Sequence, residues 1–239
     1  MRTLVIGDIH GGLKGLVQAL NSAEIKDEDH LIFMGDYVDG WSEAAQVIQF
    51  LIDLSKKINC VFVRGNHDVW CEEWLATGEV NPKWYMHGGK ETLASYESFS
   101  KEQKVAHLQF FENTKNYHLD AENRLFLHAG FTSQHGVTGE ALEENFYKDR
   151  TLWEMAVAMD KNIAKDALNY PKRLKKYTEI YIGHTPTTNF GQTVPMNVEN
   201  VWNVDTGATV KGKLTIMDIN TKEFVQSDYL SSLYPDEKR

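Results

Sequence analysis

Short runs of apolar residues recur along the chain, and segments with helical spacing separate several of them. The runs are rich in Val, Ile, Leu and Phe and cover Thr3 to Ile6, Leu31 to Met34, Cys60 to Val63, Leu125 to Leu127, Ile180 to Ile182, Val201 to Val204 and Leu214 to Ile219. Near-continuous apolar runs of this length are typical of strands buried on both faces. The sequence therefore predicts one buried strand for each run.

The beginning of the chain alternates strand and helix. Helical spacing extends from Leu13 to Ala23 and from Ser42 to Leu54, between the first three predicted strands. A β-α-β-α-β order implies parallel strands joined by right-handed crossovers. Two further segments, about 72–116 and 139–176, have a polar helical pattern. We expect them to form helical, cap-like insertions around the sheet.

Length and composition favour a single globular domain over residues 1–239. The chain has 239 residues, of which 42% are hydrophobic and 25% charged, as in an ordinary one-core protein. We expect disorder only from Tyr234 to Arg239. No segment approaches the ~20 apolar residues that a membrane helix needs. Cys60 and Cys71 form no CxxC pair, so a cytoplasmic location with reduced thiols is the prediction.

The charge balance limits the classes of partner. The net charge of −9 comes from 34 acidic and 25 basic side chains, which argues against a broad nucleic-acid-binding face. A phosphorylated substrate remains compatible with this charge, because bound cations would reverse the sign of the potential inside one cleft.

Polar side chains follow the predicted strands. The motifs GDIH, GDYVD, RGNHD, HAG, GHT and VDTGA each begin where an apolar run ends. Their polar residues should therefore meet at the carboxyl edge of a sheet, where ligands of open α/β sheets bind. The candidate metal ligands in these motifs are Asp8, His10, Asp36, Asn66, His128 and His184.

Carboxylate and neutral imidazole together suit Mn, Fe, Zn, Ni or Co, whereas calcium prefers oxygen ligands alone. A carboxylate that bridges two cations holds them ~3.5 to 4 Å apart, close enough to clamp a phosphoryl group. Asp36 is the candidate for this bridge. We expect two divalent metal ions per chain, with Mn²⁺ as the first choice and the other four metals as alternatives.

In order and spacing, these motifs resemble those of the PPP-type metallophosphoesterases, the calcineurin-like superfamily that includes Ser/Thr protein phosphatases. The resemblance runs from about Gly7 to Leu214. Small bacterial and phage phosphatases and symmetrical diadenosine tetraphosphate hydrolases share the most features, including a W-x-x-N-G-G-x-x-T-x-x-S-Y segment that here begins at Trp84. The resemblance implies an α/β fold in which helices flank a two-layer β-sandwich, with the active site at the carboxyl ends of strands.

The resemblance also implies roles for individual residues. A first metal would be bound by Asp8, His10 and Asp36. A second would be bound by Asp36, Asn66, His128 and His184. His67 would donate a proton to the departing oxygen, and Asp39 would orient it and keep it cationic, as suits an imidazole with a neighbouring carboxylate. Arg64 would bind phosphate through its planar fork.

This chain departs from the family pattern at the phosphate-binding arginines. Where GDYVDRG has an arginine, this chain has Gly40, followed by Trp41. The later LWxR motif reads LWEM, although Arg150 lies just upstream. We therefore expect either that Arg150, Lys90 or another cation binds the substrate phosphate in place of this arginine, or that the substrate differs.

Two further departures lie near the proposed proton donor. The GNHE motif reads GNHD, with Asp68, and the NGG motif reads HGG, with His87. Asp68 keeps the charge of the acid that it replaces. We expect His87 to contribute a ligand or an acid near the leaving group.

The predicted function is hydrolysis of phosphomonoesters, including phosphoserine and phosphothreonine in proteins, by in-line attack of a metal-bridging hydroxide. The alternative substrate is a dinucleoside polyphosphate or another nucleotide, with Trp41, Trp84 or Tyr85 stacking a base. A non-catalytic binding module with the same fold is a third alternative, because fold alone does not establish activity. A degenerate member should have lost a ligand or His67, and this chain retains them all.

Overall fold

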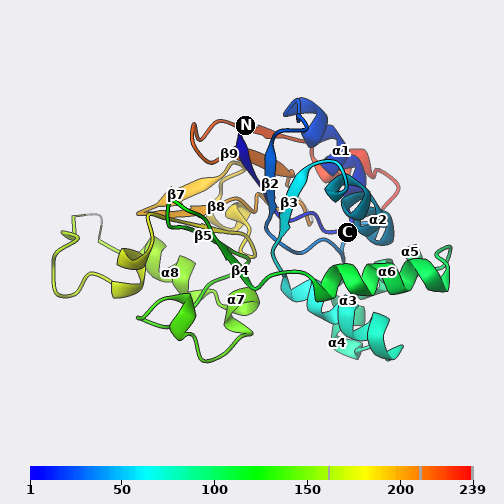
Figure 1. The fold of residues 1–239 in the computed structure, drawn as a ribbon, viewed down its shortest axis with the longest axis horizontal. Coiled ribbons are helices and arrows are strands. Elements are labelled where there is room, and N and C mark those ends of the chain that lie inside the picture. The colour runs from blue at the N-terminus through cyan, green and yellow to red at the C-terminus, as the bar shows by residue number, and fades with distance from the viewer. Residues whose placement is uncertain (161, 210–211, 238–239) are drawn as a thin grey trace.

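Two mixed sheets pack face to face in the computed structural model, which describes residues 1–160, 162–209 and 212–237 (Figure 1). The first sheet has the order β10-β9-β1-β2-β3 and consists of β1 (Thr3–Ile6), β2 (His30–Phe33), β3 (Asn59–Phe62), β9 (Thr215–Asp218) and β10 (Phe224–Gln226). The second has the order β4-β5-β6-β8-β7 and consists of β4 (Tyr117–Leu119), β5 (Arg124–Leu127), β6 (Glu179–Ile182), β7 (Met196–Val198) and β8 (Val201–Asn203).

The strands that lead into the polar motifs are parallel. Strand β1 pairs with β2, and β2 with β3, in parallel register, as the β-α-β-α-β pattern predicts. In the second sheet β5, β6 and β8 are also parallel. The carboxyl ends of the three parallel strands of each sheet therefore lie at a common edge.

The space between the sheets is filled by apolar side chains from both. Val5 and Ile32 of the first sheet and Phe126 and Tyr181 of the second belong to one buried cluster. The rings of Phe126 and Tyr181 stack with centroids 4.8 Å apart. The central strands also pack against helices on their other face, which explains the near-continuous apolar runs of the sequence.

Helices cover the outer faces of the sandwich (Figure 1). The first sheet is covered by α1 (Leu13–Ser22), α2 (Ala44–Ser55), α3 (Asn66–Thr77), α5 (Lys90–Ser95), α6 (Lys101–Glu112) and the C-terminal α9 (Leu230–Leu233). The second is covered by α7 (Asn145–Lys148) and α8 (Thr151–Ala158). Short turns of helix complete the chain: α4 (Pro82–Trp84), the π-helical η1 (Tyr85–Gly89), and the 3-10 segments η2 (Val137–Gly139), η3 (Lys172–Lys176) and η4 (Thr187–Phe190).

This arrangement confirms the predicted α/β class and the β-sandwich flanked by helices. Each predicted strand is present to within one residue at its ends, and α1 and α2 to within two. Segment 72–116 lies on the first sheet and is mostly helical, whereas 139–176 has only two short α-helices and a 3-10 turn among the residues described. No described helix is both long and apolar enough to cross a membrane.

The C-terminal segment differs from the expected disorder. Tyr234 is buried, its ring stacks on Trp41 with centroids 5.0 Å apart, and its hydroxyl donates to Glu43. Ser42 donates to Glu237 at 2.6 Å. The prediction of disorder is therefore wrong for residues 234–237, because a buried aromatic anchors them, and Lys238 and Arg239 lie outside the described residues.

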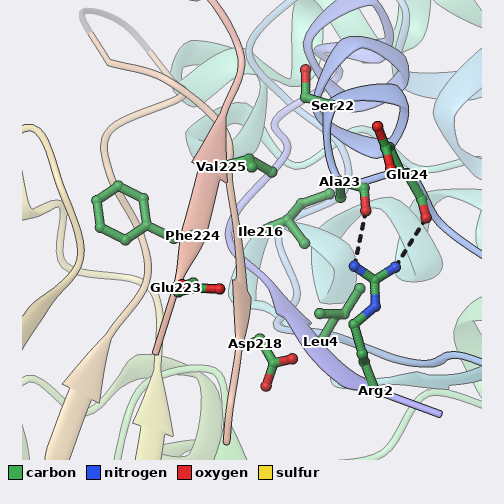
Figure 2. Close-up of a pocket in the computed structure, with 10 residues that line it drawn as sticks. All are labelled: Arg2, Leu4, Ser22, Ala23, Glu24, Ile216, Asp218, Glu223, Phe224 and Val225. Carbon is green, nitrogen blue, oxygen red and sulfur yellow. Dashed lines mark hydrogen bonds between the residues drawn. The ribbon is translucent and has the colours of Figure 1, made fainter. Parts of the chain in front are cut away.

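Arg2, just before β1, bonds to the residues that follow α1. Arg2 donates to the carbonyl oxygens of Ala23 at 3.1 Å and Glu24 at 3.0 Å, beside a cavity of about 290 Å³ (Figure 2). Its guanidinium also pairs with Asp29 at 2.6 Å. Asp29 is only 2% exposed, and the bonds from Arg2 and from the backbone of Lys26 overcome the effect of burial and lower its pKa to about 2.

We expect Asp29→Asn to lower the free energy of unfolding by about 1 to 2 kcal/mol at pH 7, since the folded state binds the ionised carboxylate better than the unfolded state does. A depressed folded pKa contributes stability above the unfolded pKa of ~3.9, and this stability is lost as pH falls towards the folded pKa of about 2. The difference between variant and wild type in chemical denaturation should therefore shrink between about pH 5 and pH 3.

Asp53→Asn is the matched control, because Asp53 pairs with Lys56 on the exposed face of α2. A surface pair of this kind contributes less than about 1 kcal/mol. A difference for Asp29→Asn that stays constant between pH 7 and pH 3 would show that its carboxylate charge does not stabilise the fold.

Candidate metal and phosphoester site

The turns that follow five of the parallel strands converge on one cleft. Asp8 and His10 follow β1, Asp36 follows β2, and Asn66 and His67 begin α3 just after β3. From the second sheet, His128 follows β5 and His184 follows β6. All of the predicted metal ligands thus come from the carboxyl ends of strands, where the sequence pattern places them.

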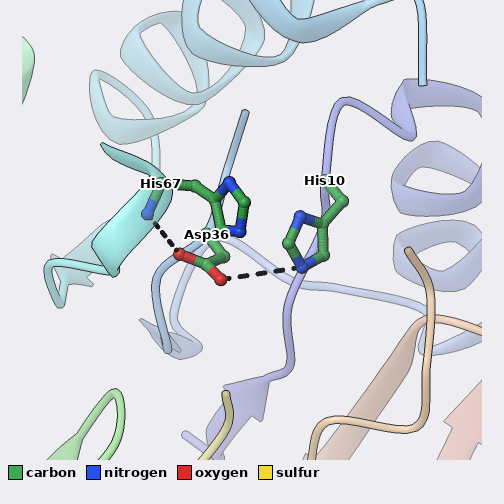
Figure 3. Close-up of side chains that lie close together, drawn as sticks. All are labelled: His10, Asp36 and His67. Atoms are coloured by element: carbon green, nitrogen blue, oxygen red, sulfur yellow. Dashed lines mark hydrogen bonds and ion pairs between the residues drawn. The ribbon is translucent and has the colours of Figure 1, made fainter. Parts of the chain in front are cut away.

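Two groups of potential ligand atoms share Asp36. One group contains His10, Asp36 and His67, and the other contains Asp36, His128 and His184, each with ligand atoms within 4.8 Å of one another. The carboxylate Oδ2 of Asp36 lies 3.6 Å from His10 Nε2 (Figure 3) and 3.3 Å from His128 Nε2. A carboxylate placed between two sets of imidazoles is suited to bridge two cations.

Hydrogen bonds orient two of the imidazoles for metal binding. His10 Nδ1 contacts the carbonyl oxygen of Asp39 at 3.0 Å, and His128 Nδ1 contacts the carbonyl oxygen of Met34 at 2.7 Å. A carbonyl accepts a hydrogen bond, so Nδ1 carries the proton in both rings. The lone pair of Nε2 is then directed at Asp36, as a metal ligand requires.

Burial favours the neutral form of two histidines in the cluster. It lowers the pKa of His10 to about 4. Burial and the neighbouring His128 lower the pKa of His184 well below its usual range. Burial also opposes protonation of His128, but the charge of Asp36 raises the pKa of this imidazole, and a bound cation would replace its proton.

Asp8 is a buried acid whose two carboxylate oxygens differ in their partners. Its Oδ2 lies 3.8 Å from His10 Nε2 and accepts a hydrogen bond from the backbone N–H of His184 at 3.1 Å. Its Oδ1 is buried and has no hydrogen-bond partner among the described residues. Burial, together with the charges of Asp205 and Asp36, raises the pKa of Asp8 well above its usual range. A buried acid with an unpaired oxygen beside neutral imidazoles fits a divalent cation, which would stabilise its ionised form.

Asn66 supplies the amide oxygen of the second group. Its Oδ1 lies 3.3 Å from His128 Nε2, and the residue is the first of α3. Gly65, just before it, packs so closely on Asp36 that a β-carbon would overlap the carboxylate. This glycine therefore allows the amide and the shared carboxylate to meet.

Backbone strain is concentrated at the site. His10, Asp36, Asp39 and His184 have φ values of 50°, 50°, 63° and 66°, in the left-handed region that residues with a side chain seldom adopt. Each such residue costs about 1 to 3 kcal/mol and persists only where the surroundings fix it. The strain turns these side chains from the strand ends into the cleft.

Asp68 fixes the turn that carries Asp36, a role that the sequence did not reveal. It is fully buried, and its Oδ2 accepts hydrogen bonds from the backbone N–H groups of Asp36 and Gly65, both at 2.8 Å. Its Oδ1 accepts from the N–H of Tyr37 at 2.9 Å. Asp68 thereby holds the strained loop without lining either of the cavities described below.

His67 is paired with Asp39 in the geometry that the resemblance implies. His67 Nδ1 lies 2.6 Å from Asp39 Oδ2. Burial opposes protonation, but the charge of Asp36 and the hydrogen bond to Asp39 raise the pKa of His67 to about 9. The imidazole is therefore protonated at neutral pH, with Nε2 left to donate a proton.

The aromatic segment that begins at Trp84 holds Asp39. Trp84 donates through Nε1 to both carboxylate oxygens of Asp39, at 2.9 and 2.7 Å, and Thr92 donates to Oδ1 at 2.6 Å. Trp84 is 0% exposed. It cannot stack a substrate base in this position, and its spacing to Thr92 is explained by their common partner.

Two adjoining cavities flank His10 and His67. The first, which we call the Arg150 cavity, has a volume of about 490 Å³ and is lined by Asp36, Asn66, Arg150, His184 and Asp205 in addition to the two histidines. The second, the His87 cavity, has a volume of about 360 Å³ and is lined by Met86, His87, Glu91 and the backbone of Gly40 and Gly88 in addition to the same histidines. Asp205, which follows β8 in the VDTGA motif, was not assigned a role from sequence, although its strand-end position marks it.

The structure brings only some of the predicted substrate-binding residues to these cavities. Arg150 lines the first and donates to Thr185 at 2.9 Å, and His87 lines the second. Arg64 instead pairs with Glu72 at 3.0 Å and donates hydrogen bonds to Thr114 and Phe111 at the end of α6. Lys90 is exposed and lines neither cavity.

Trp41 is also outside the cavities. It is 1% exposed, stacks on Tyr234 and donates through Nε1 to the carbonyl oxygen of Ala208 at 2.7 Å. The structure thus places Trp41 in the core beneath the site, where no ring face is open to a base. Of the three aromatic residues predicted to stack a base, Tyr85 has an accessible ring, since it is 41% exposed.

Gly40 does not leave a space that an arginine would fill. Its φ is +121°, and a β-carbon would lie 2.6 Å from the carbonyl oxygen of His10. Any side chain here would strain the backbone and displace the metal-binding turn. An arginine could therefore not be placed at this position without moving the turn, because the backbone conformation here suits only glycine.

A family model described as calcineurin-like phosphoesterase matches residues 1–210. The chain belongs to the calcineurin-like phosphoesterase family. Members of this family are metal-dependent hydrolases of phosphate esters, and the buried, partly unpaired ligand cluster described above fits that chemistry. The predictions of a metallophosphoesterase, a hydrolase and a metal-binding protein are confirmed.

Among curated members of the calcineurin-like phosphoesterase family, the chain is similar to enzymes named bis(5'-nucleosyl)-tetraphosphatase PrpE [asymmetrical]. It is 26% identical to the protein of Oceanobacillus iheyensis, over 94% of this chain and 91% of that protein. It is 27% identical to that of Bacillus cereus strain AH187, over 90% of this chain and 89% of that protein. These relatives carry the name of the asymmetrical enzymes, whereas the sequence motifs suggested the symmetrical ones.

Solved structures support the same fold. A metallophosphoesterase from Sphaerobacter thermophilus superimposes with a TM-score of 0.56 at 18% identity, over 98% of this chain and 95% of that one. A protein serine/threonine phosphatase from Saccharomyces cerevisiae gives 0.58 at 14% identity, over 95% and 79%. At these identities the likeness extends to the architecture alone.

We expect isothermal titration with Mn²⁺ to show two binding events per chain in wild type. Asp36→Asn should weaken both events, because its carboxylate faces both groups of imidazoles. Asn66→Ala should weaken one, since its amide belongs to the His128 group alone. Removing a ligand commonly lowers metal affinity by 10-fold or more, judging from the 10- to 100-fold effect of even the hydrogen-bond partners of ligands.

Asp53→Asn, far from the cleft on α2, is the control for both variants. If Asp36→Asn lost only one of the two binding events, Asp36 would not be the shared ligand.

Proposed function

We propose that this metallophosphoesterase hydrolyses dinucleoside polyphosphates. The observation that carries the proposal is room for substrate on both sides of His67, in the adjoining Arg150 and His87 cavities. A phosphomonoester has a substituent only on its leaving oxygen, whereas the attacked phosphorus of a dinucleoside polyphosphate carries a chain on each side. Cavities of a few hundred Å³ suit ligands of nucleotide size. The names of the PrpE relatives favour the same class.

Different residues of this chain contribute to different parts of P–O cleavage. When bound, two divalent cations would lower the pKa of a water molecule and neutralise charge on the phosphoryl oxygens. The candidate ligands are Asp8, His10, Asp36, Asn66, His128 and His184, with Asp36 shared. Manganese stays our first choice of metal.

Arg150 and His67 act on opposite sides of the phosphorus in this scheme. The guanidinium of Arg150, in the wall of the cavity beside His184, donates hydrogen bonds to a nonbridging oxygen. His67, held by Asp39 and protonated at neutral pH, donates its Nε2 proton to the oxygen of the leaving group. Leaving-group protonation and anion stabilisation are thus provided by separate, pre-positioned residues.

Phosphomonoesters, including phosphoserine and phosphothreonine in proteins, form the second candidate class. The side chain of Arg150 favours it, because a planar guanidinium can engage two oxygens of a terminal phosphate. A panel of diadenosine tetraphosphate, phosphopeptides and p-nitrophenyl phosphate, assayed with Mn²⁺, separates the two classes. A kcat/KM for diadenosine tetraphosphate below that for the phosphopeptides would overturn the first proposal.

His67→Asn should lower kcat by ~10² to 10⁴, the usual contribution of a general acid, while Mn²⁺ affinity stays near that of wild type. The loss should be smaller with p-nitrophenyl phosphate, because nitrophenolate departs without a proton. Comparing kcat for nitrophenyl and alkyl phosphates measures this difference. Equal losses with both leaving groups would remove His67 from the role of acid.

Arg150→Ala should raise KM by roughly tenfold, since a hydrogen bond to a charged group contributes ~1.5 to 3 kcal/mol and 1.4 kcal/mol corresponds to a factor of ten. Arg64→Ala is the matched control. It removes bonds to Glu72, Thr114 and Phe111 outside the cavities and should lower the melting temperature with KM unchanged. A raised KM for Arg64→Ala with no change for Arg150→Ala would exchange the two assignments.

A further inference from the structure

The His87 cavity differs in chemistry from the Arg150 cavity, although His10 and His67 line both. The Arg150 cavity carries a guanidinium and three candidate metal ligands of the second group, Asp36, Asn66 and His184. The described residues that line the His87 cavity include no lysine or arginine, and the imidazole of His67 is already paired with Asp39. An anionic phosphate chain is therefore accommodated better on the Arg150 side.

Glu91 gives the His87 cavity its acceptor character. It is half-buried in the first turn of α5, and no described side chain or N–H forms a hydrogen bond or ion pair with its carboxylate. A carboxylate in this setting attracts hydroxyl and N–H donors and repels phosphate.

His87 adds a second acceptor to the same cavity. Its Nδ1 lies 2.7 Å from the carbonyl oxygen of Lys83, so Nδ1 carries a proton. In the neutral ring Nε2 is then an acceptor. Together with Glu91, His87 offers a hydrogen-bonding environment that suits the hydroxyl groups of a sugar.

Two glycines, Gly40 and Gly88, line the His87 cavity with backbone atoms alone. Gly88 packs against the Gly40 turn so closely that a β-carbon would lie 2.9 Å from the amide nitrogen of Gly40. Gly40 itself has no room for a side chain. The space beside His67 is therefore kept open, and Met86, which is 78% exposed, forms an apolar rim to it.

We propose that the His87 cavity binds the leaving group and that Glu91 restricts it to groups rich in hydroxyl donors and poor in negative charge. This assignment rests on the proposed function. For a dinucleoside tetraphosphate, the leaving group is then the nucleoside monophosphate, with its ribose towards Glu91 and His87. The longer triphosphate chain lies in the Arg150 cavity.

This orientation determines which phosphorus is attacked. Water oxygen forms a new bond to the second phosphorus from the leaving nucleoside. The bond from that phosphorus to the bridging oxygen breaks, its electron pair stays on the oxygen, and His67 protonates that oxygen on the departing monophosphate. The water releases its protons to solvent, from which His67 is reprotonated. The products are a nucleoside monophosphate and a nucleoside triphosphate that contains the new oxygen.

The position of that oxygen tests the orientation directly. Diadenosine tetraphosphate hydrolysed in H₂¹⁸O with Mn²⁺ and analysed by mass spectrometry should give labelled ATP and unlabelled AMP. Label in AMP would place the triphosphate in the leaving-group position and overturn the proposal. Two molecules of ADP as products would overturn it as well, because both halves of the substrate would then be equally charged leaving groups.

Glu91→Lys tests the cause of the selectivity. Reversing this charge should admit the triphosphate to the His87 cavity, so that at least a tenth of the label moves into AMP. Glu97→Lys is the control: Glu97 is exposed just after α5, lines neither cavity and should leave all the label in ATP. If Glu91→Lys and Glu97→Lys both matched wild type, Glu91 would not select the leaving group.

Failure of the proposed function gives a different result. Wild type would then leave diadenosine tetraphosphate intact while hydrolysing p-nitrophenyl phosphate. The leaving-group assignment would still predict a higher kcat/KM for AMP, whose leaving group is adenosine, than for ATP, whose leaving group is ADP. Glu91→Lys should lower that ratio by about fivefold or more. An unchanged ratio would overturn the assignment.

Discussion

The position of Asp36 is the constraint on which the rest of the site depends. Its carboxylate faces imidazoles from both sheets, and its backbone is held in a left-handed conformation by hydrogen bonds to the buried Asp68. His128 reaches it from the second sheet while bonding to the carbonyl oxygen of Met34 in the first. The candidate shared ligand thus lies at the junction between the two sheets, and a shift of either sheet would separate the two groups of candidate ligands.

This arrangement concentrates unfavourable free energy at the cleft. Asp8, Asp36, Asp68 and Asp205 are all buried, and burial raises the pKa of Asp8 well above its usual range and that of Asp68 to about 7. Four site residues also have strained backbone. The packed core between the sheets and the helices outside must hold these residues in their strained conformations. Bound cations would offset the repulsion between the carboxylates. Metal binding is therefore expected to stabilise the fold as well as to enable catalysis.

Much of this could be predicted from the sequence because burial and chain direction leave local signals. Strands buried on both faces appear as apolar runs, and the polar residues after parallel strands necessarily meet at one edge. The edge strands β4, β7 and β10 were missed, because they are only three residues long and partly exposed and so lack a continuous apolar run. The helical pattern of 139–176 overstated the helix content for a similar reason, since turns there carry the same polar spacing as a solvated helix.

Roles that depend on distant contacts could not be predicted. Trp84 and Thr92 converge on Asp39 from about 50 residues away, so their spacing in the motif gave no indication of a common partner. Trp41 was mistaken for a substrate contact because it follows the metal-binding motif, but a tyrosine near the other end of the chain buries it. The RGNHD motif implied a phosphate-binding role for Arg64, yet its guanidinium turns to Glu72 and α6.

The central claim is that one carboxylate, Asp36, joins two metal ions at the junction of the sheets. Crystals grown with Mn²⁺ and measured at the manganese absorption edge test it most directly, because anomalous scattering locates each ion independently of any assay. The account predicts two peaks ~3.5 to 4 Å apart with the carboxylate of Asp36 in contact with both, one beside Asp8 and His10 and the other beside His128 and His184. A single peak, or two peaks of which only one touches Asp36, would contradict it.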